Sequence, residues 1–376
     1  MKRAAAAAIS LMTGLAMLTG CSRAEVEETI QPLVADAIEE SDSEAEAVKE
    51  EDESPLIPEI DTDIKIHAGS RIAVVSKCVK GEYWKMVKKG MEDAVKEINK
   101  AYGYKKDDQI TMTFEGPDNE EDVETQINTI DAVIAENPDV LCISASDMDS
   151  CEAQLEAAKE NGIPVIAFDS NVAEKKLVKA YRGTDNVQVG KMAAYQLGSA
   201  LGKMGKVAVF SAQQKTKSVQ DRVEGFMNNI GKYGDIEVVE TIYSDQVDDM
   251  EASMKEVLEK YPTLDGVFCT NADITEMYLN LEKSDEHDAP ALVGVDATTK
   301  QQEAIRNGEE IGCVSQQPYA MGYQTIWAAV ETTAPKKSVV IEKNVLSNPA
   351  WIDADCLDDP DYSGSVSYTH LTLPTP

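Results

Sequence analysis

The sequence predicts an α/β protein with two doubly wound lobes, each built on a parallel sheet. From Arg71 onward, short apolar segments alternate with segments of helical pattern, and the alternation occurs twice, over about residues 71–183 and again over about 184–315. Strands of a parallel sheet that is covered on both faces consist of continuous apolar residues, and their alternation with helices is typical of such sheets. A chain of 376 residues is long enough for two such cores.

Nine apolar segments have the length and composition of buried strands. They are residues 72–75, 110–114, 140–144, 164–168, 206–210, 236–242, 266–270, 292–295 and 311–315. The clearest helical patterns lie at residues 84–100, 121–136 and 150–160. In the second of these patterns the residues Val123, Ile127, Ile130 and Ile134 recur every three or four positions, which places them on one face of a helix.

The N-terminus has the pattern of an export signal. Lys2 and Arg3 precede an apolar stretch, residues 4–18, that is too short to span a bilayer comfortably. The next segment, LTGC at residues 18–21, resembles the cleavage site of bacterial lipoproteins. That resemblance implies removal of a signal peptide of residues 1–20 and attachment of diacylglycerol to the sulfur of Cys21. The lipid would hold the mature protein on the outer face of a membrane.

An acidic segment follows the predicted cleavage site. Residues 24–63 are rich in Glu and Asp, contain Lys49 as their one positive charge and have no aromatic residue. Because such a segment buries too little apolar surface to offset its ordering entropy, residues 21–64 are predicted to form a disordered tether. The chain as a whole has a net charge of −33. This charge argues against a nucleic-acid partner, since phosphate backbones would repel it.

The cysteines and histidines do not indicate a metal site. Of the seven cysteines, Cys142, Cys269 and Cys313 lie in apolar segments and are read as buried thiols. No pair of cysteines has the spacing of metal ligands, and the chain has three histidines. We therefore expect no metal and no cofactor. Disulfides among the cysteines other than Cys21 are possible outside the cell, and the sequence leaves them open.

The C-terminal segment is set aside. Residues 366–375, VSYTHLTLPT, resemble the translation of a sequencing adapter joined to the reading frame. We treat residues 366–376 as an artefact tail and exclude them from the reasoning about the fold.

Polar and aromatic side chains follow most of the predicted strands, at the point where each strand ends. The candidate ligand-binding residues chosen in this way are Lys77, Tyr83, Trp84, Ser144, Asp169, Arg222, Asn271, Asp296 and Gln316. The carboxyl ends of parallel strands meet at one edge of a sheet, where ligands of doubly wound folds bind. If the carboxyl edges of the two lobes face each other, these side chains surround a cleft.

Two interpretations of these polar residues compete. Asp, Asn and Ser after a strand are also preferred as helix caps, and we assign Asp147, Asp221 and Asp273 to that role. Helix capping explains less well why Arg222 and Gln316 stand at the carboxyl edge of a sheet. Carboxylates accept hydrogen bonds from vicinal hydroxyls, amides and Arg donate them, and aromatic rings cover apolar C–H faces. The mixture therefore favours a site for a neutral polyol.

Seven motifs carry a resemblance to a known family. They are GEYWKMVKKG, NPDVLCISASD, GIPVIAFDS, GTDNVQVGKMAA, DRVEGF, VGVDAT and CVSQQPYAMGY. In this order they resemble the periplasmic monosaccharide-binding proteins of the ribose and galactose type, the receptors of ABC sugar importers. The resemblance covers about residues 71–345. It implies the type I periplasmic binding fold, in which two lobes are joined by three crossovers.

The resemblance also implies domain boundaries. The N-terminal lobe is expected to take residues 71–183 and 316–343, and the C-terminal lobe residues 184–315 and 344–365. The crossovers are expected near residues 183–186, near Gln316 and near residues 342–344.

Several residue roles follow from the resemblance. Tyr83 and Trp84 match the aromatic pair that clamps the sugar, and Asp169 matches the carboxylate that binds hydroxyls. Arg222, Asn271, Asp296 and Gln316 match further sugar-binding positions. Two positions depart from a ribose binder, because Ser170 replaces an expected Arg and Ser144 an expected Asn. Lys77 and the segment FEGPDNE look more like relatives that bind other sugars or a furanosyl autoinducer signal.

The expected function is capture of a monosaccharide by a monomeric, lipid-anchored extracellular protein that closes by hinge motion and delivers the sugar to the permease of an ABC transporter. A sensory receptor that signals to a chemoreceptor or a sensor kinase is the alternative. A sugar-responsive DNA-binding repressor would need a helix–turn–helix where this chain has the export signal and the tether.

An enzyme is not expected. The sequence contains no phosphate-binding loop of the form GxxxxGK[ST], no HExxH and no GxSxG. Asp169 and Asp296 imitate the carboxylate pair of a glycosidase. A sugar-binding cleft, however, uses both carboxylates as ionised acceptors.

Overall fold

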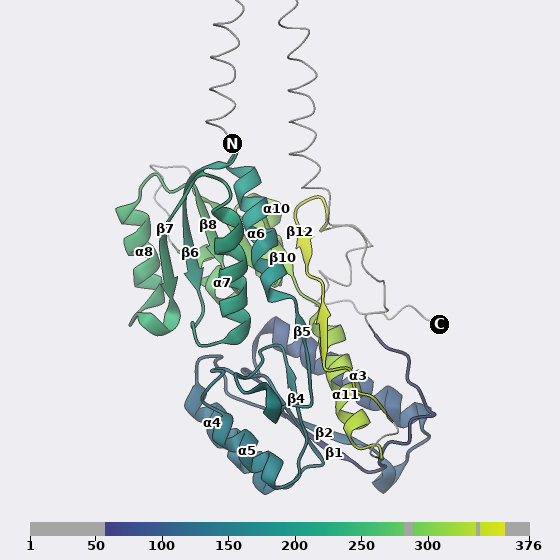
Figure 1. The fold of residues 1–376 in the computed structure, drawn as a ribbon. Coiled ribbons are helices and arrows are strands. Elements are labelled where there is room, and N and C mark those ends of the chain that lie inside the picture. Colours follow the sequence, from purple (N-terminus) through teal and green to yellow (C-terminus); the bar gives the residue numbers. More distant parts are fainter. Residues whose placement is uncertain (1–56, 282–288, 336–338, 358–376) are drawn as a thin grey trace, which may run out of the picture. The chain divides into compact units, whose positions relative to one another are not determined.

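The computed structural model describes residues 57–281, 289–335 and 339–357, which belong to one compact unit beginning at Leu56. The predicted signal peptide, Cys21, most of the predicted tether and the tail after residue 365 lie outside these residues. Figure 1 shows two lobes, each built around a sheet with helices on both faces. This α/β architecture of two largely parallel sheets confirms the predicted fold class. Within the described ranges, no helix has the length and apolar character needed to cross a membrane.

The first lobe contains a six-stranded sheet in the order β11-β5-β4-β3-β1-β2. Its strands are β1 (Arg71–Val75), β2 (Thr111–Glu115), β3 (Val140–Ile143), β4 (Val165–Phe168), β5 (Ala180–Thr184) and β11 (Asn344–Ser347). All neighbouring strands pair in parallel. Its helices are α3 (Gly81–Ala101), α4 (Val123–Ala135), α5 (Glu152–Glu160) and α11 (Pro318–Thr332), with short 3-10 turns at Lys106–Asp108 and Lys175–Leu177.

The second lobe repeats this arrangement with the strand order β12-β10-β9-β8-β6-β7. Its strands are β6 (Met204–Ser211), β7 (Asp235–Tyr243), β8 (Gly266–Cys269), β9 (Ala291–Val295), β10 (Gly312–Ser315) and β12 (Ala350–Ile352). The edge strand β12 is antiparallel to β10. Its helices are α6 (Asn186–Ala200), α7 (Lys217–Ile230), α8 (Met250–Lys260), α9 (Ala272–Leu279) and α10 (Thr299–Asn307), with a 3-10 turn at Ser244–Gln246.

Each sheet is buried on both faces, which explains why its strands are continuously apolar. Along β1, Ile72 and Val74 pack into the core under α3 and α11, whereas Ala73 and Val75 pack into the core under α4 and α5. The alternation follows from the two-residue period of a strand. In Figure 1 the pair α4 and α5 lies on one side of the first sheet and the pair α3 and α11 on the other.

Every one of the nine predicted strands forms a strand, but three strands escaped prediction. β5 has the sequence AYRGT, in which Tyr181, Arg182 and Thr184 interrupt any apolar run. β11 and β12 are short strands at the edges of their sheets. Strands of three or four residues are too short to produce the apolar pattern on which the prediction rests.

The chain passes between the lobes three times. It leaves the first sheet after β5 and continues into α6, and it returns after β10 into α11. The third passage lies between β11 and β12, at residues 348–349, because β11 pairs with β5 of the first sheet. This corrects the expected crossover at residues 342–344 and the assignment of residues 344–347 to the second lobe. The cause is the parallel ladder that residues 344–347 form with β5.

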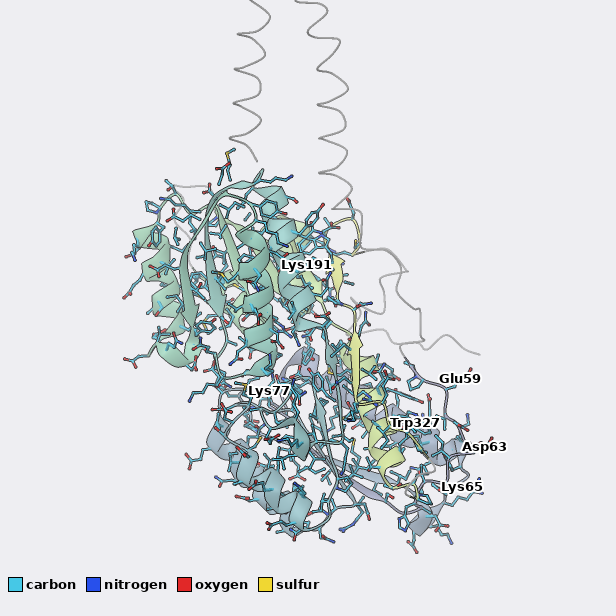
Figure 2. The ribbon with its side chains drawn as sticks, in the orientation of Figure 1. Glu59, Asp63, Lys65, Lys77, Lys191 and Trp327 are labelled. Carbon is cyan, nitrogen blue, oxygen red and sulfur yellow. The ribbon has the colours of Figure 1, made fainter. Side chains whose placement is uncertain are left out.

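Residues 57–64 correct the predicted extent of the tether. Ile57, Ile60 and Ile64 pack against the core between α3 and α11. The Tyr102 hydroxyl donates to the carbonyl oxygens of Asp61 at 2.8 Å and Ile64 at 2.7 Å. Figure 2 shows Glu59, Asp63 and Lys65 along the side of the first lobe that carries Trp327 of α11. The isoleucines supply the apolar burial that the more N-terminal acidic residues lack.

Candidate functional site

A cavity of about 230 Å³ lies at the carboxyl ends of strands from both sheets. Eight of the nine predicted ligand-binding residues line it: Lys77, Tyr83, Trp84, Asp169, Arg222, Asn271, Asp296 and Gln316. Ser144 does not line it but lies fully buried behind Asp169. Lys77, labelled in Figure 2, lies where the two lobes meet. Doubly wound sheets bring ligand-binding residues together at this edge, as the sequence predicts.

The aromatic pair begins helix α3 and is held in a fixed orientation. The rings of Tyr83 and Trp84 are perpendicular, with an interplanar angle of 88° and centroids 5.2 Å apart. The indole Nε1 of Trp84 donates to Oε1 of Glu120 at 2.6 Å. The ammonium of Lys77 lies 5.6 Å from the centroid of the Trp84 ring. Both rings therefore border the cavity without being free to rotate.

Asp169, which follows β4, contacts several of the first-lobe side chains in and behind the lining of the cavity. Its Oδ1 accepts the Tyr83 hydroxyl at 2.7 Å, and its Oδ2 accepts the Ser144 hydroxyl at 2.9 Å. The Lys77 ammonium lies 3.0 Å from the same Oδ2. Burial opposes ionisation of Asp169, but Lys77 and the Tyr83 hydrogen bond outweigh it and hold the pKa of this carboxyl below its ordinary value.

Lys77 is buried in this network, with 4% of its surface exposed. Its ammonium also contacts the Ser170 hydroxyl at 3.3 Å and Oε2 of Glu120 at 3.6 Å. Burial lowers the pKa of Lys77, yet the neighbouring Asp169 and Glu120 prevail and raise it overall. Lys77 thus remains charged and occupies acceptors of Asp169 that the sequence analysis assigns to sugar hydroxyls.

Asp296 is the counterpart of Asp169 on the second lobe. Its Oδ1 accepts Nε2 of Gln316 at 2.6 Å, and its Oδ2 accepts the backbone N–H of Ala272 at 2.9 Å. Burial raises the pKa of Asp296 above its ordinary value, against the opposing effects of Arg222 and Gln316. Gln316 in turn accepts the Thr184 hydroxyl at 2.8 Å and so connects two of the crossing segments.

Asp169 and Asp296 share an unusual backbone conformation. Their φ angles are 56° and 97°, in the left-handed region that residues other than glycine rarely adopt. Such backbone strain is concentrated at functional sites, where the surrounding structure enforces it. It occurs in each lobe directly after a buried strand, at the edge where the cavity lies.

Arg222 projects from α7 of the second lobe and is anchored by two of its nitrogens. Its Nε donates to Oδ1 of Asn186 at 2.8 Å, and its Nη1 donates to the Thr270 carbonyl at 2.7 Å. Among the described residues no bond engages Nη2, which leaves this donor for a ligand. Asn271 caps α9, because its Oδ1 accepts the backbone N–H of Ile274 at 3.1 Å.

None of the three aspartates predicted as helix caps is an N-cap, because Cys151, Thr216 and Asn271 hold that position in α5, α7 and α9. Asp147 accepts the backbone N–H groups of Asp149 at 2.9 Å and Ser150 at 3.2 Å, in the turn that leads to α5. Asp221 lies inside α7, which begins at Lys217, and pairs with Lys217. Asn271, and not Asp273, caps α9. α7 and α9 begin earlier than the sequence pattern suggests, whereas α5 begins slightly later, at Glu152.

The sequence analysis missed several cavity-lining residues. They are Cys78, Lys80, Gly81, Glu82, Asp118, Glu120, Val219, Ala272, Asp273, Glu276 and Thr298. Glu120 lies in the segment FEGPDNE, which had been noted as unlike a ribose binder, and this was the available signal. Asp273 had been assigned to a helix cap. Most of the others lie on loops and first helical turns, where a polar residue carries no sequence signal of its own.

The two lobes are in contact around the cavity. Oε2 of Glu82, on α3, accepts the backbone N–H of Thr299 at 2.9 Å, at the start of α10. Nε2 of Gln213 donates to the Glu120 carbonyl at 3.2 Å. The hydroxyls of Ser170 and Ser218 are 2.6 Å apart. These hydrogen bonds join first-lobe and second-lobe residues, so the lobes close over the cavity.

The cysteines and possible metal ligands add no second site. Cys142 and Cys313 are fully buried thiols outside any disulfide, and burial raises the pKa of each. Across residues 57–281, 289–335 and 339–357, no group of His, Cys, Asp and Glu is arranged to hold a metal ion.

Comparisons with known proteins agree with this architecture, since two α/β lobes that close over a small polar cavity are typical of a solute-binding protein. The chain belongs to the periplasmic binding protein domain family, whose profile matches residues 72–337. Membership of the family confirms the resemblance seen in the motifs and places the protein outside the cytoplasm. The protein is accordingly a solute-binding protein and not an enzyme.

Individual relatives are distant in sequence. The ribose import binding protein RbsB of Bacillus subtilis (strain 168) is 26% identical over 220 residues, which are 58% of this chain and 71% of the relative. A solute-binding protein of Agrobacterium vitis with bound D-fucose has a TM-score of 0.71 at 25% identity, covering 79% of this chain and 100% of that one. One of Agrobacterium radiobacter in complex with D-arabinose has a TM-score of 0.69 at 25% identity, covering 80% and 99%.

The pKa of Asp273 leads to a first prediction. Burial and the nearby Glu120, Asp296 and Glu276 raise the pKa of Asp273 to about 7. A folded-state pKa above the unfolded value stabilises the protein at low pH, and this contribution is lost as the pH rises from about 4 to about 7. Because more than a third of the Asp273 surface still reaches solvent despite the surrounding cavity walls, solvent screening limits the effect to about 1 kcal/mol at most.

Asp273→Asn is therefore expected to raise the melting temperature by about 2 °C at pH 8 and to leave it unchanged at pH 4. Thermal unfolding of the two proteins at both pH values checks this. An equal difference at pH 4 and pH 8 would contradict the prediction.

Proposed function

We propose that this protein captures a monosaccharide in the cavity between its lobes and delivers it to the permease of an ABC transporter. It acts outside the cell as a monomer that is tethered to the membrane by lipid on Cys21. The observation that carries the proposal is the convergence of eight predicted sugar-binding side chains on one cavity. Those side chains come from both lobes, so a ligand between them would favour the closed arrangement.

The size and lining of the cavity support a small polar ligand. Drug-sized ligands occupy pockets of roughly 300–1,000 Å³, and this cavity of about 230 Å³ is smaller. Tyr83 and Trp84 offer ring surfaces against which the C–H face of a sugar ring packs. Arg222 and Asn271 offer donors, and Asp296 offers an acceptor, on the opposite lobe. The ligands named for the relatives, ribose, D-fucose and D-arabinose, have the same combination of hydroxyls and C–H faces.

Closure provides the link to transport. Glu82 with Thr299 and Ser170 with Ser218 join the two lobes around the cavity. A bound sugar that contacts both lobes adds its own interaction energy to these bonds. The permease then recognises a surface that exists in the closed form, which is how a binding protein signals that it is loaded.

A thermal-shift panel of pentoses, hexoses and alditols with the full chain tests the proposal. At a ligand concentration of 100 times Kd, binding stabilises the folded state by about 2.7 kcal/mol, which is a rise of several degrees in melting temperature. Trp84→Ala is expected to reduce the shift to about a third or less, because truncation of a central aromatic contact costs about 2 kcal/mol or more in binding. The proposal is overturned if no sugar of the panel shifts the melting temperature of the wild-type protein, or if Trp84→Ala retains the full shift.

A further inference from the structure

The charges that line the cavity are strongly unbalanced. Seven carboxylates border it: Glu82, Asp118, Glu120, Asp169, Asp273, Glu276 and Asp296. Its three cations are Lys77, Lys80 and Arg222. A neutral sugar requires no such excess of negative charge. The excess therefore carries information about the ligand beyond its hydroxyl groups.

Most of the seven carboxylates already have partners in the protein. Glu82 accepts from Thr299, and Asp118 lies 2.6 Å from the Lys80 ammonium. Glu120 and Asp169 accept from Trp84 and Tyr83, as described above, and Asp296 accepts from Gln316. Glu276 accepts the Thr298 hydroxyl at 2.6 Å. Within the described part of the chain, the Asp273 carboxylate has no hydrogen bond and no ion pair.

The donors of the cavity are also largely used. Lys77 contacts Asp169, Glu120 and Ser170, and Nε2 of Gln316 donates to Asp296. What remains for a ligand is Nη2 of Arg222, the amide nitrogen of Asn271 and the ammonium hydrogens of Lys80 that its pair with Asp118 leaves over. The acceptors that remain, both oxygens of Asp273 above all, outnumber these donors. The cavity thus has fewer hydrogen-bond donors than acceptors left for a ligand, and its seven carboxylates outnumber its three cations.

We propose that the ligand carries a protonated amine, as an aminated monosaccharide does, and that its ammonium group lies against Asp273 and Glu276. An ammonium has three donors and no acceptor, which is the complement of this part of the cavity. The inference rests on the proposed function, since it specifies the class of sugar for the same cavity. Asp273 and Glu276 are three residues apart in α9, so both face the same side of the helix.

The neighbouring surface has the same sign of charge. A second hollow of about 490 Å³ adjoins the cavity and shares Asp118, Glu120, Asn271 and Asp273 with it. Its lining contains five carboxylates, those of Asp118, Glu120, Glu121, Asp248 and Asp273, and no Lys or Arg. A hollow lined by one sign of charge concentrates ligands of the opposite sign and speeds their association. A cationic sugar would be drawn toward Asp273 from this side.

The carboxylates near Asp273 also repel one another. Burial and the negative charges of Glu120, Asp296 and Glu276 make ionisation of Asp273 unfavourable, so its pKa lies well above that of a free aspartate. A cation between these groups removes the repulsion. This relief is available to an ammonium and not to a hydroxyl.

Isothermal titration of the full chain with matched sugars tests the inference. The probes are 2-amino-2-deoxyhexoses, the parent neutral hexoses, and the N-acetylated forms, which keep the nitrogen but lose its charge. The measurements are made near pH 7.5, above the pKa of about 7 of Asp273 in the empty cavity, where its carboxylate is mostly ionised and much of the amine is still protonated. The wild-type protein is expected to bind an aminated sugar about 10-fold or more tighter than its neutral parent, about 1.4 kcal/mol. The N-acetylated form is expected to lose this preference.

Asp273→Asn is expected to reduce the ratio of aminated to neutral affinity to about 3-fold or less, and to remove the salt dependence of the aminated ligand. Asp235→Asn is the matched control, because it removes the same charge from the exposed start of β7 in the same lobe and should keep the 10-fold ratio. A neutral parent that binds as tightly as the aminated sugar overturns this inference and leaves the proposed function intact. An unchanged ratio in Asp273→Asn also overturns it. Absence of binding by every sugar overturns the proposed function itself.

Discussion

Asp169→Ala is expected to lower the free energy of unfolding by about 3–5 kcal/mol, in addition to abolishing sugar binding. Removal of one partner from a buried ion pair leaves the other charge uncompensated, and that loss is of this size. Here the uncompensated charge is the ammonium of Lys77, 4% exposed and 3.0 Å from Asp169. The hydroxyls of Tyr83 and Ser144 lose their acceptor at the same time. Urea unfolding of the two proteins at pH 7 measures the difference.

A second substitution separates the charge from the other contacts. If the cost arises from the uncompensated Lys77, the double variant Lys77→Met, Asp169→Leu recovers most of the lost stability, because an apolar pair of similar volume often replaces a buried ion pair without loss. The double variant still fails to bind sugar. If the single variant Asp169→Ala is as stable as the wild type, Lys77 must find another partner. That result would contradict the network of Lys77, Tyr83 and Ser144 around Asp169.

Gly190→Ala is expected to destabilise the second lobe by about 3 kcal/mol or more. A Cβ at Gly190 of α6 would lie 1.9 Å from the carbonyl oxygen of Arg222 and 2.5 Å from the backbone nitrogen of Phe226, both on α7. Backbone atoms of a neighbouring helix cannot move aside as a flexible side chain does, so the two helices must separate. Separation would also displace Arg222 from Asn186 and Thr270 and weaken sugar binding.

Gly234→Ala is the matched control for this variant. A Cβ at Gly234 meets no heavy atom within 4 Å, so its stability is expected to remain within about 0.5 kcal/mol of wild type. Thermal unfolding and sugar titration of both variants provide the comparison. Equal stability of Gly190→Ala and Gly234→Ala would contradict the close contact of α6 and α7.

Much of the fold could be predicted because the sheets are buried on both faces. All four residues of β4, with the sequence VIAF, are buried. A strand that is covered on both faces is apolar at every position, which makes it recognisable in the sequence. The same reasoning located Asp169 and Asp296, since a carboxylate directly after a buried strand lies at the carboxyl edge of the sheet. β5 and β11 were missed because their stability comes from pairing with neighbours and not from their own apolar character.

The missed parts of the site depend on tertiary contacts. Glu120 lies in a loop and is significant because it accepts from Trp84 and neighbours Lys77. Asp273 was predicted to be a helix cap, and only the position of α9 beside the cavity shows that its carboxylate has no partner among the residues that the structure describes. The packing of Ile57, Ile60 and Ile64 was hidden by the acidic composition of the segment around them. Local composition cannot reveal contacts with residues distant in the sequence.

The most direct test of the central claim is a crystal structure of the protein grown with the sugar that gives the largest thermal shift. The account predicts one monosaccharide in the cavity between the lobes, packed against Trp84 and hydrogen-bonded by Arg222 and Asn271. If the sugar carries an amine, its nitrogen lies within hydrogen-bond distance of Asp273. A sugar bound at any other place, with this cavity holding none, would contradict the account.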